Sequence, residues 1–170
     1  DGRRLGPGEA GDLYFRSLIG QDFEYHNAEE KTEAAHLEEG VGTLGDIGWL
    51  DEEGYLFLSD RRIDMIISGG VNIYPAEIES EMTRHEAVRD AAVFGIPHAD
   101  WGEEVKAVIE LAEGFAESDE LKARILDDLA GRLAKFKMPR TIDVVDELPR
   151  QANGKLMKRT LKDPYWAEAK

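Results

Sequence analysis

The segment PRQANGKLMKR, residues 149–159, gathers the side chains that could act on a charged substrate, because it places four cations around an Asn-Gly turn. One of them, Lys155, directly follows a glycine. The chain as a whole has a formal net charge of −15, yet residues 131–162 hold nine basic and only three acidic residues. A basic segment on an acidic body suggests a confined anionic ligand such as a phosphate group. Charge alone fits a solvated C-terminal face better.

The composition is that of a globular chain of 170 residues, which is enough for one compact domain or two small ones. The hydrophobic fraction of 42% allows a buried core, and the charged fraction of 34% is mixed in sign, which argues against disorder. A pI near 4.7 disfavours nucleic acid and anionic membranes as partners. The absence of cysteine excludes disulfides, thiolate catalysis and cysteine-ligated metals, and it fits a reducing compartment, so we expect a cytoplasmic location.

The chain carries no targeting or membrane-spanning signal. No apolar run approaches the ~20 residues that a transmembrane helix needs. The opening sequence DGRRLGPGEAGDLYFRS has neither an initiating Met nor an apolar signal region. We therefore expect a segment of a longer protein.

Residues 1–60 have the pattern of a separate β-rich piece. The stretch 11–17 alternates enough to be a strand, and 48–60 is typical of a hairpin with an acidic turn. Between them, 28–40 predicts a short acidic helix that ends at Gly40.

Residues 61–170 predict a small α+β domain. The helix signals are Pro75 at a first helical position and Ser118 as an N-cap before an apolar stripe. The expected order is strand 64–70, helix 74–85, strands 88–96 and 105–111, helix 118–136 and strand 141–148.

Three longer motifs follow in order along the chain: GDIGWLDEEGYLFLSDRRIDMIISGGVNIYPAEIE, DAAVFGIPHADWGEEVKAVI and LPRQANGKLMKR. In combination they resemble the adenylate-forming (ANL) superfamily of acyl-CoA synthetases, peptide-synthetase adenylation domains and luciferases. The chain looks most like a fatty-acyl-CoA ligase, and the resemblance covers essentially all 170 residues. It implies an α+β fold, a small mixed C-terminal domain preceded by a partial β-rich subdomain, the end of a larger N-terminal domain.

The resemblance implies a reaction in two halves. ATP and a carboxylate give an acyl-adenylate, and the CoA thiol then displaces AMP, with a rotation of the C-terminal domain in between. The implied cofactors are ATP, CoA and Mg²⁺. No phosphate-binding loop of the G-x-x-x-x-G-K-[ST] type occurs here, so the metal ligands and the acyl pocket are expected in the missing N-terminal domain, and the isolated chain is expected to be inactive. The sequence leaves open whether the protein forms a homo-oligomer.

Three residues match the family's adenylation residues. Lys155 matches the catalytic lysine, whose ammonium can neutralise phosphoryl and carboxylate oxygens in the transition state; the alternative is a surface lysine after a turn. Asp46 matches a ribose-binding aspartate, although Leu44 stands where the family usually has Thr, and the alternative is a turn aspartate. Arg61 matches a second ribose contact or a salt bridge beside the hinge.

Other residues match the family's CoA-binding side. Gly69 and Gly70 would let the pantetheine arm pass beside the backbone, and a plain turn or bulge is the alternative. Trp101 resembles an adenine-stacking residue and Phe136 could oppose it; core packing is the alternative for both.

Cations near Phe136 complete the CoA-binding prediction. Lys137 and Arg140 could meet the CoA phosphates, whereas Met138 stands where a relative can carry a cation. Arg62 and Ile63 fall at the expected hinge, where the family commonly has Asp or Lys, and backbone rotation does not need a charged side chain.

The remaining polar residues have simpler interpretations. Arg150, Lys158 and Arg159 are assigned to field-setting or surface roles, and the four histidines do not have a metal-binding spacing. Two alternatives to a CoA ligase remain: an adenylation domain that loads a carrier-protein thiol, and a non-catalytic binding domain derived from this fold.

Overall fold

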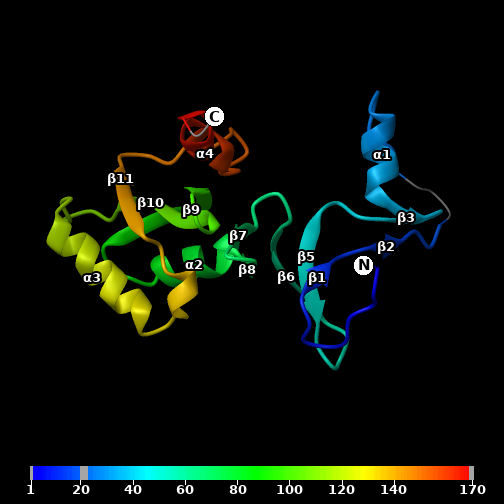
Figure 1. The fold of residues 1–170 in the computed structure, drawn as a ribbon, viewed down its shortest axis with the longest axis horizontal. Helices are drawn as coiled ribbons and strands as arrows, with labels where there is room; N and C mark the ends of the chain where they lie inside the picture. Colours follow the sequence, from blue (N-terminus) through cyan, green and yellow to red (C-terminus); the bar gives the residue numbers. More distant parts are fainter. Residues whose placement is uncertain (1, 20–22, 169–170) are drawn as a thin grey trace. The chain divides into compact units, whose positions relative to one another are not determined.

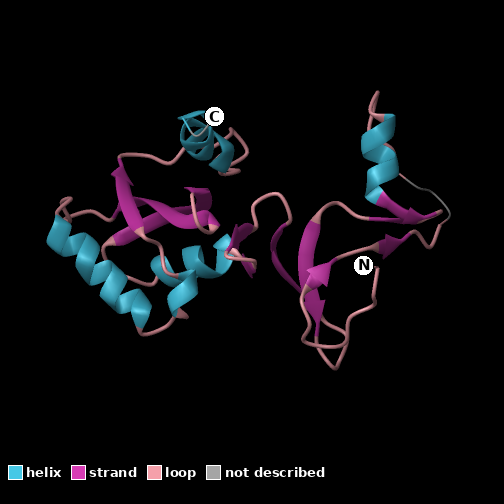
Figure 2. Cartoon of the chain, viewed as in Figure 1, coloured by secondary structure: helices cyan, strands magenta, loops and turns pink. Residues whose placement is uncertain are grey.

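A computed structural model describes residues 2–19 and 23–168 of the chain, which divides into two compact units, Asp1–Ile63 and Asp64–Lys170. Figure 1 labels the elements in chain order, and Figure 2 separates helices, strands and loops. Helices and strands both contribute substantially, so the predicted α+β class is confirmed.

The first unit is β-rich and contains two small antiparallel sheets beside the helix α1 (Glu29–Ala35). One sheet has the order β1-β5-β6, with the strands Gly11–Asp12, Asp46–Leu50 and Leu56–Arg61. The other has the order β2-β4-β3, with the strands Phe15–Arg16, Val41–Gly42 and His36–Glu38. Its identity as the end of a larger domain remains a prediction.

The hairpin predicted over 48–60 is confirmed as β5 and β6. Its acidic turn is ordered by the Asp51 carboxylate, which accepts hydrogen bonds from the backbone N–H of Glu53 at 3.0 Å and of Tyr55 at 2.8 Å. The helix predicted over 28–40 is too long, because residues 36–38 leave it to pair with β4. The strand predicted over 11–17 is two short strands that join different sheets.

The second unit is organised around a long antiparallel strand pair, β9 (Val88–His98) and β10 (Gly102–Leu111). β11 (Thr141–Val145) lies parallel to β10 on the sheet path β11-β10-β7-β8. The short strands β7 (Ile66–Ser68) and β8 (Val71–Ile73) form a hairpin, and the sequence predicted only the first of them.

Helices cover both faces of this sheet (Figure 2). Ala91 and Val93 of β9 belong to the cluster buried under α2 (Pro75–Met82) and α3 (Asp119–Ala130). The alternate residues Ala92 and Phe94 face the opposite side, where α4 (Lys158–Glu168) packs. Burial on both faces explains the continuous apolar run of this strand.

The helix α3 begins and packs as its sequence predicts. The Ser118 side chain accepts a hydrogen bond from the Leu121 N–H at 3.1 Å, and Leu121, Ile125 and Leu129 are buried. It ends at Ala130 rather than at residue 136, because Gly131 follows and residues 135–137 form a separate 3-10 turn.

The sequence did not predict α4, because Pro164 lies inside it and argues against a helix. Tertiary contacts compensate. The Trp166 Nε1–H donates to the Gly95 carbonyl at 3.1 Å, and the Tyr165 hydroxyl donates to the Asp143 carboxylate at 3.0 Å.

Asp143 also pairs with the buried Lys106, which is 6% exposed, at 2.8 Å. Burial favours the neutral acid, but hydrogen bonding and charge from Lys106, with the Tyr165 hydroxyl, outweigh it and hold the pKa of Asp143 below its usual value. The depressed pKa makes the ionised carboxylate stabilising at neutral pH, and this stabilisation is lost as pH falls through the folded-state pKa.

We predict that Asp143→Asn lowers the free energy of unfolding at pH 7 by about 1–3 kcal/mol, since it leaves a buried cation without its partner. The difference from wild type should stay constant from pH 7 to 5 and narrow below about pH 4. Urea unfolding across this range measures it, with the exposed Asp146→Asn as the matched control. A difference that persists unchanged in acid would contradict the ion-pair explanation.

Candidate active site

The basic segment forms a tight hairpin that follows β11. Arg150 and Leu156 face each other as an isolated antiparallel bridge, and the Met157 N–H donates to the Pro149 carbonyl at 2.8 Å. The hairpin thus returns the chain on itself between the sheet and the first turn of α4.

Lys155 lies at the end of this hairpin and is exposed. Its carbonyl accepts from the Gln151 N–H at 2.9 Å, and its own N–H donates to the Asn153 side chain at 3.0 Å. Gly154 has φ +84°, a conformation that suits glycine and closes the turn. The lysine is therefore displayed on an ordered turn.

The Lys155 ammonium differs from three nearby cations, each of which has a carboxylate partner. Arg150 pairs with Asp90, Lys158 with Glu79, and Arg159 with Asp163. Within the described ranges 2–19 and 23–168, no carboxylate lies within 4.0 Å of the Lys155 Nζ atom. Its charge remains available to an anionic group.

Asp46 and Arg61, the two predicted ribose contacts, lie next to each other in the first unit. They are direct partners in the β5–β6 register, and the Arg61 Nε atom is 3.4 Å from Asp46 Oδ1. Gly45, with φ +81°, precedes them and accepts a hydrogen bond from the Arg62 N–H at 2.8 Å. The salt bridge foreseen as the alternative for Arg61 is present, and the ribose role stays a prediction.

Gly69 and Gly70 form the two-residue turn between β7 and β8, where Ser68 faces Val71. Their φ values of +57° and +81° match the turn type that requires a left-handed backbone at both positions. An added Cβ at either position would meet nothing within 4 Å. The turn alone explains both glycines, and it leaves open space beside them.

The backbone of Trp101 joins this turn to the start of β10. The Gly69 N–H donates to the Trp101 carbonyl at 2.9 Å. The ring is 44% exposed, stacks with His98 at 4.9 Å between centroids, and lies 3.9 Å from the guanidinium carbon of Arg140. Glu104 lies 3.6 Å from Arg140 and 3.8 Å from His98. Three of the predicted CoA-binding residues are thus brought together.

Phe136 and Lys137 lie on the 3-10 turn Lys135–Lys137. The Phe136 ring is exposed, so core packing does not account for it. Lys137 is held by Glu77 of α2 at 2.6 Å. The described residues record no ring contact between Phe136 and Trp101, so their opposition stays a prediction. Met138 packs against the core, which explains why no cation stands there.

The predicted hinge residues lie at the boundary between the units. Arg62 pairs with Asp12 at 3.3 Å, and Ile63 is 82% exposed. Neither the Arg62 ion pair nor the exposure of Ile63 tests whether the chain rotates at this boundary.

The sequence did not predict the carboxylates that hold the basic hairpin. Glu79, Asp90 and Glu110 come from α2, β9 and β10, far from residues 149–159 along the chain. Each carries an ordinary acidic side chain, so only the fold reveals the pairing.

The described residues offer no metal centre, since no three of their His, Asp or Glu side chains gather in a way that could hold an ion. Among the described helices, none has the length and apolar character needed to cross a membrane.

Known proteins with similar sequences belong to the same superfamily that the motifs resemble. Residues 77–155 match the family model of the AMP-binding enzyme C-terminal domain. The chain is 41% identical over 162 residues to 2-succinylbenzoate–CoA ligase of Geobacillus kaustophilus, covering 95% of this chain and 32% of the relative. It is 37% identical over 169 residues to fatty acid–[acyl-carrier-protein] ligase ScoC of Streptomyces coeruleorubidus, covering 99% and 32%. The chain spans about a third of the length of these curated relatives.

A solved structure gives the same result. o-Succinylbenzoate CoA synthetase of Bacillus subtilis, in complex with its acyl-adenylate intermediate, superposes with a TM-score of 0.83 at 39% identity. The match covers 96% of this chain and 32% of that structure. The fold is therefore that of the C-terminal portion of adenylate-forming enzymes, as the motifs predicted, and the chain belongs to the adenylate-forming superfamily.

Proposed function

We propose that the chain is the C-terminal part of an ATP-dependent acyl-CoA ligase, which acts with a larger N-terminal domain. The carboxylate of the substrate attacks the α-phosphate of ATP and releases pyrophosphate, and the CoA thiol then attacks the acyl carbon and releases AMP. The observation that carries the proposal is the Lys155 ammonium, displayed on an ordered turn with no described carboxylate within 4.0 Å.

Adenylation is assigned to Lys155 and to the Asp46–Arg61 pair. As the carboxylate approaches the phosphate, negative charges come together, and a mobile ammonium can neutralise them where they develop. Lysine suits this point-charge role better than the fork-shaped guanidinium. The Asp46 carboxylate can accept hydrogen bonds from both ribose hydroxyls, while Arg61 holds it in place at 3.4 Å.

Thioester formation is assigned to the Gly69-Gly70 turn and to the cations and rings near it. Open space beside the two glycines suits the passage of a pantetheine arm. Trp101 offers an exposed indole for the adenine, and Arg140 lies close enough to meet a phosphate. Phe136 and Lys137 would complete this surface. The ligands of the Mg²⁺ that accompanies ATP are proposed to lie in the N-terminal domain.

The acyl group is proposed to be a fatty acid or another hydrophobic carboxylate. Two relatives support a carboxylic acid with a large organic group, since one is named for 2-succinylbenzoate and another for fatty acids. The second relative is named for a carrier-protein acceptor, which favours carrier loading as a second candidate. CoA-dependent consumption of ATP in the absence of any carrier protein distinguishes the two.

The first prediction from the proposed function concerns Lys155 in the parent ligase, meaning the longer protein proposed to contain this chain. Lys155→Ala should lower pyrophosphate release from ATP and acid by about 100-fold or more, because a transition-state charge contact is lost. Thioester formation from supplied acyl-adenylate and CoA should survive. The two rates are measured separately, with Lys162→Ala as the matched control. Unchanged rates in both assays would reduce Lys155 to a surface residue.

The second prediction concerns Asp46. Asp46→Asn should raise the KM for ATP about 10- to 100-fold, because hydrogen bonds to a charged acceptor are worth about 1.5–3 kcal/mol each. Steady-state kinetics in the parent ligase provides the test. A charge-swapped variant, Asp46→Arg with Arg61→Asp, separates the two roles: it would restore a purely structural ion pair but not ribose binding. Full recovery in that variant would argue against the ribose assignment.

The third prediction concerns the chain by itself. Residues 1–170 should form no thioester from ATP, CoA and either 2-succinylbenzoate or palmitate, since the chain spans about a third of its curated relatives and the phosphate loop and acyl pocket are proposed to lie in the N-terminal domain. Thioester formation is followed by chromatography, and circular dichroism checks that the chain is folded. Robust turnover by the folded chain would refute the two-domain proposal.

A further inference from the structure

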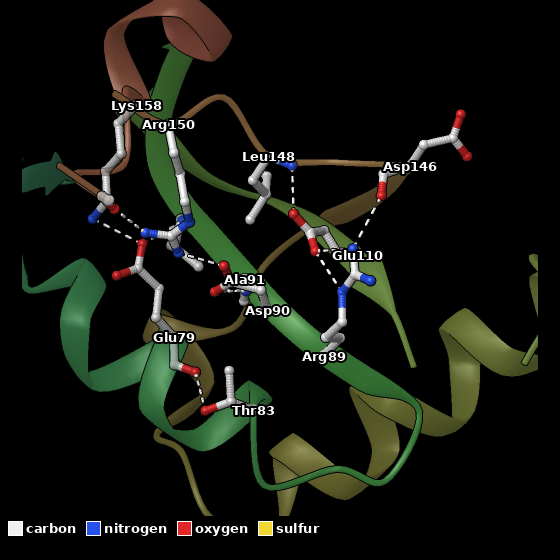
Figure 3. Close-up of polar contacts among 12 residues, drawn as sticks. Glu79, Thr83, Arg89, Asp90, Ala91, Glu110, Asp146, Leu148, Arg150 and Lys158 are labelled. Atoms are coloured by element: carbon white, nitrogen blue, oxygen red, sulfur yellow. Dashed lines mark hydrogen bonds and ion pairs between the residues drawn. The ribbon is translucent and has the colours of Figure 1, made fainter. Parts of the chain in front are cut away.

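Two cations of the basic segment form ion pairs with carboxylates of other elements, as Figure 3 shows. Arg150 reaches Asp90 on β9, and Lys158 reaches Glu79 on α2 at 2.8 Å. They lie on either side of Lys155, five residues before it and three after it. The surface or field-setting roles expected for them did not include these ion pairs.

Arg150 joins the sheet directly to the tip of the hairpin. One terminal nitrogen of its guanidinium donates to the Asp90 carboxylate, and the other donates to the Gly154 carbonyl at 2.6 Å. Gly154 immediately precedes Lys155. A single planar side chain therefore ties a strand of the buried sheet to the peptide unit that carries the lysine.

Other contacts fix the two ends of the segment. Glu79, which holds Lys158, also accepts the Val93 N–H of β9 at 2.7 Å. On the entry side, Glu110 accepts the Leu148 N–H and a hydrogen bond from Arg89 at 2.7 Å (Figure 3). The tip between these ends has its own backbone hydrogen bonds and the contacts of Arg150.

A short hairpin is only marginally stable in water without such contacts. A charge that acts on a transition state must also be held to within about 1 Å, since larger errors cost about 100-fold in rate. We propose that Arg150, held by Asp90, is a positioning residue that sets the place of Lys155 for adenylation. The proposal rests on the adenylation role assigned to Lys155 above.

The first test measures catalysis in the parent ligase. Arg150→Gln and Asp90→Asn should each lower kcat for pyrophosphate release about 10- to 100-fold and leave the KM for ATP within about threefold. The rate of thioester formation from supplied acyl-adenylate should stay within about twofold. Asp90→Asn keeps an oxygen for the Ala91 N–H, so it changes mainly the charge.

The controls isolate the proposed contact. Arg159→Gln removes a neighbouring arginine that is 89% exposed in its side chain and pairs with Asp163 at 3.2 Å, so it should leave both rates unchanged. The double variant Arg150→Gln/Asp90→Asn should be no slower than Arg150→Gln alone, because both changes break one interaction.

The second test observes the hairpin itself in the chain 1–170. Asp90→Asn should speed hydrogen exchange of the Gln151 and Gly154 amides about 10-fold or more, as measured by NMR, while Arg159→Gln leaves them unchanged. Asp90 is remote from these amides in sequence, so their intrinsic exchange rates do not change. The backbone amides of β10 serve as an internal reference, because their hydrogen exchange should stay slow in Asp90→Asn if the sheet remains folded.

The outcomes separate the two proposals. If Lys155→Ala abolishes adenylation while Arg150→Gln and Asp90→Asn leave it intact, the positioning role is overturned and the function of Lys155 stands. If Lys155→Ala has no effect, both proposals fail, whatever the amide exchange shows. A loss of both half-reactions together, or unchanged amide exchange in Asp90→Asn, would also overturn the positioning role.

Discussion

The antiparallel pairing of β9 with β10 is the constraint on which the second unit depends. Alternate side chains of β9 are buried on opposite faces, under α2 and α3 on one side and under α4 on the other. Three parts of the candidate site in this unit connect to this pair. Its turn carries Trp101, its partner strand β11 leads into the basic hairpin, and Asp90 receives Arg150. A sheet buried on both faces is rigid, so it can hold exposed side chains in fixed positions.

Charge pairing explains how an acidic chain can present a usable positive charge. The basic residues near the C-terminus do not sum to a broad positive surface, because carboxylates from α2, β9 and β10 neutralise Arg150, Lys158, Lys137 and Arg140. The partly exposed pairs Lys137–Glu77 and Arg140–Glu104 add little to the global stability. Their consequence is local: in the described part of the chain, the charge at the hairpin tip is left to Lys155. The acidic body and the basic segment thus belong to one arrangement.

Local signals carried most of what could be predicted. Ser118 and its apolar stripe defined the start of α3, Pro75 the start of α2, and the acidic turn the β5–β6 hairpin, because each depends on residues close in sequence. The failures have a common cause. Residues 36–38 leave a helix to pair with β4, α4 tolerates Pro164 because its rings pack on the sheet, and Arg150 finds a partner sixty positions away. Such choices are made by tertiary contacts, which no local pattern encodes.

The strand pair also separates the two groups of candidate residues. Asp90, which anchors the Lys155 hairpin, and His98, which stacks on Trp101, are eight positions apart on β9. At a rise of about 3.3 Å per residue, they lie roughly 25 Å from each other. The Asp90 anchor and the Trp101 ring are therefore supported from opposite ends of one strand. This separation is compatible with the predicted rotation between the two half-reactions, in which the unit would present each group in turn.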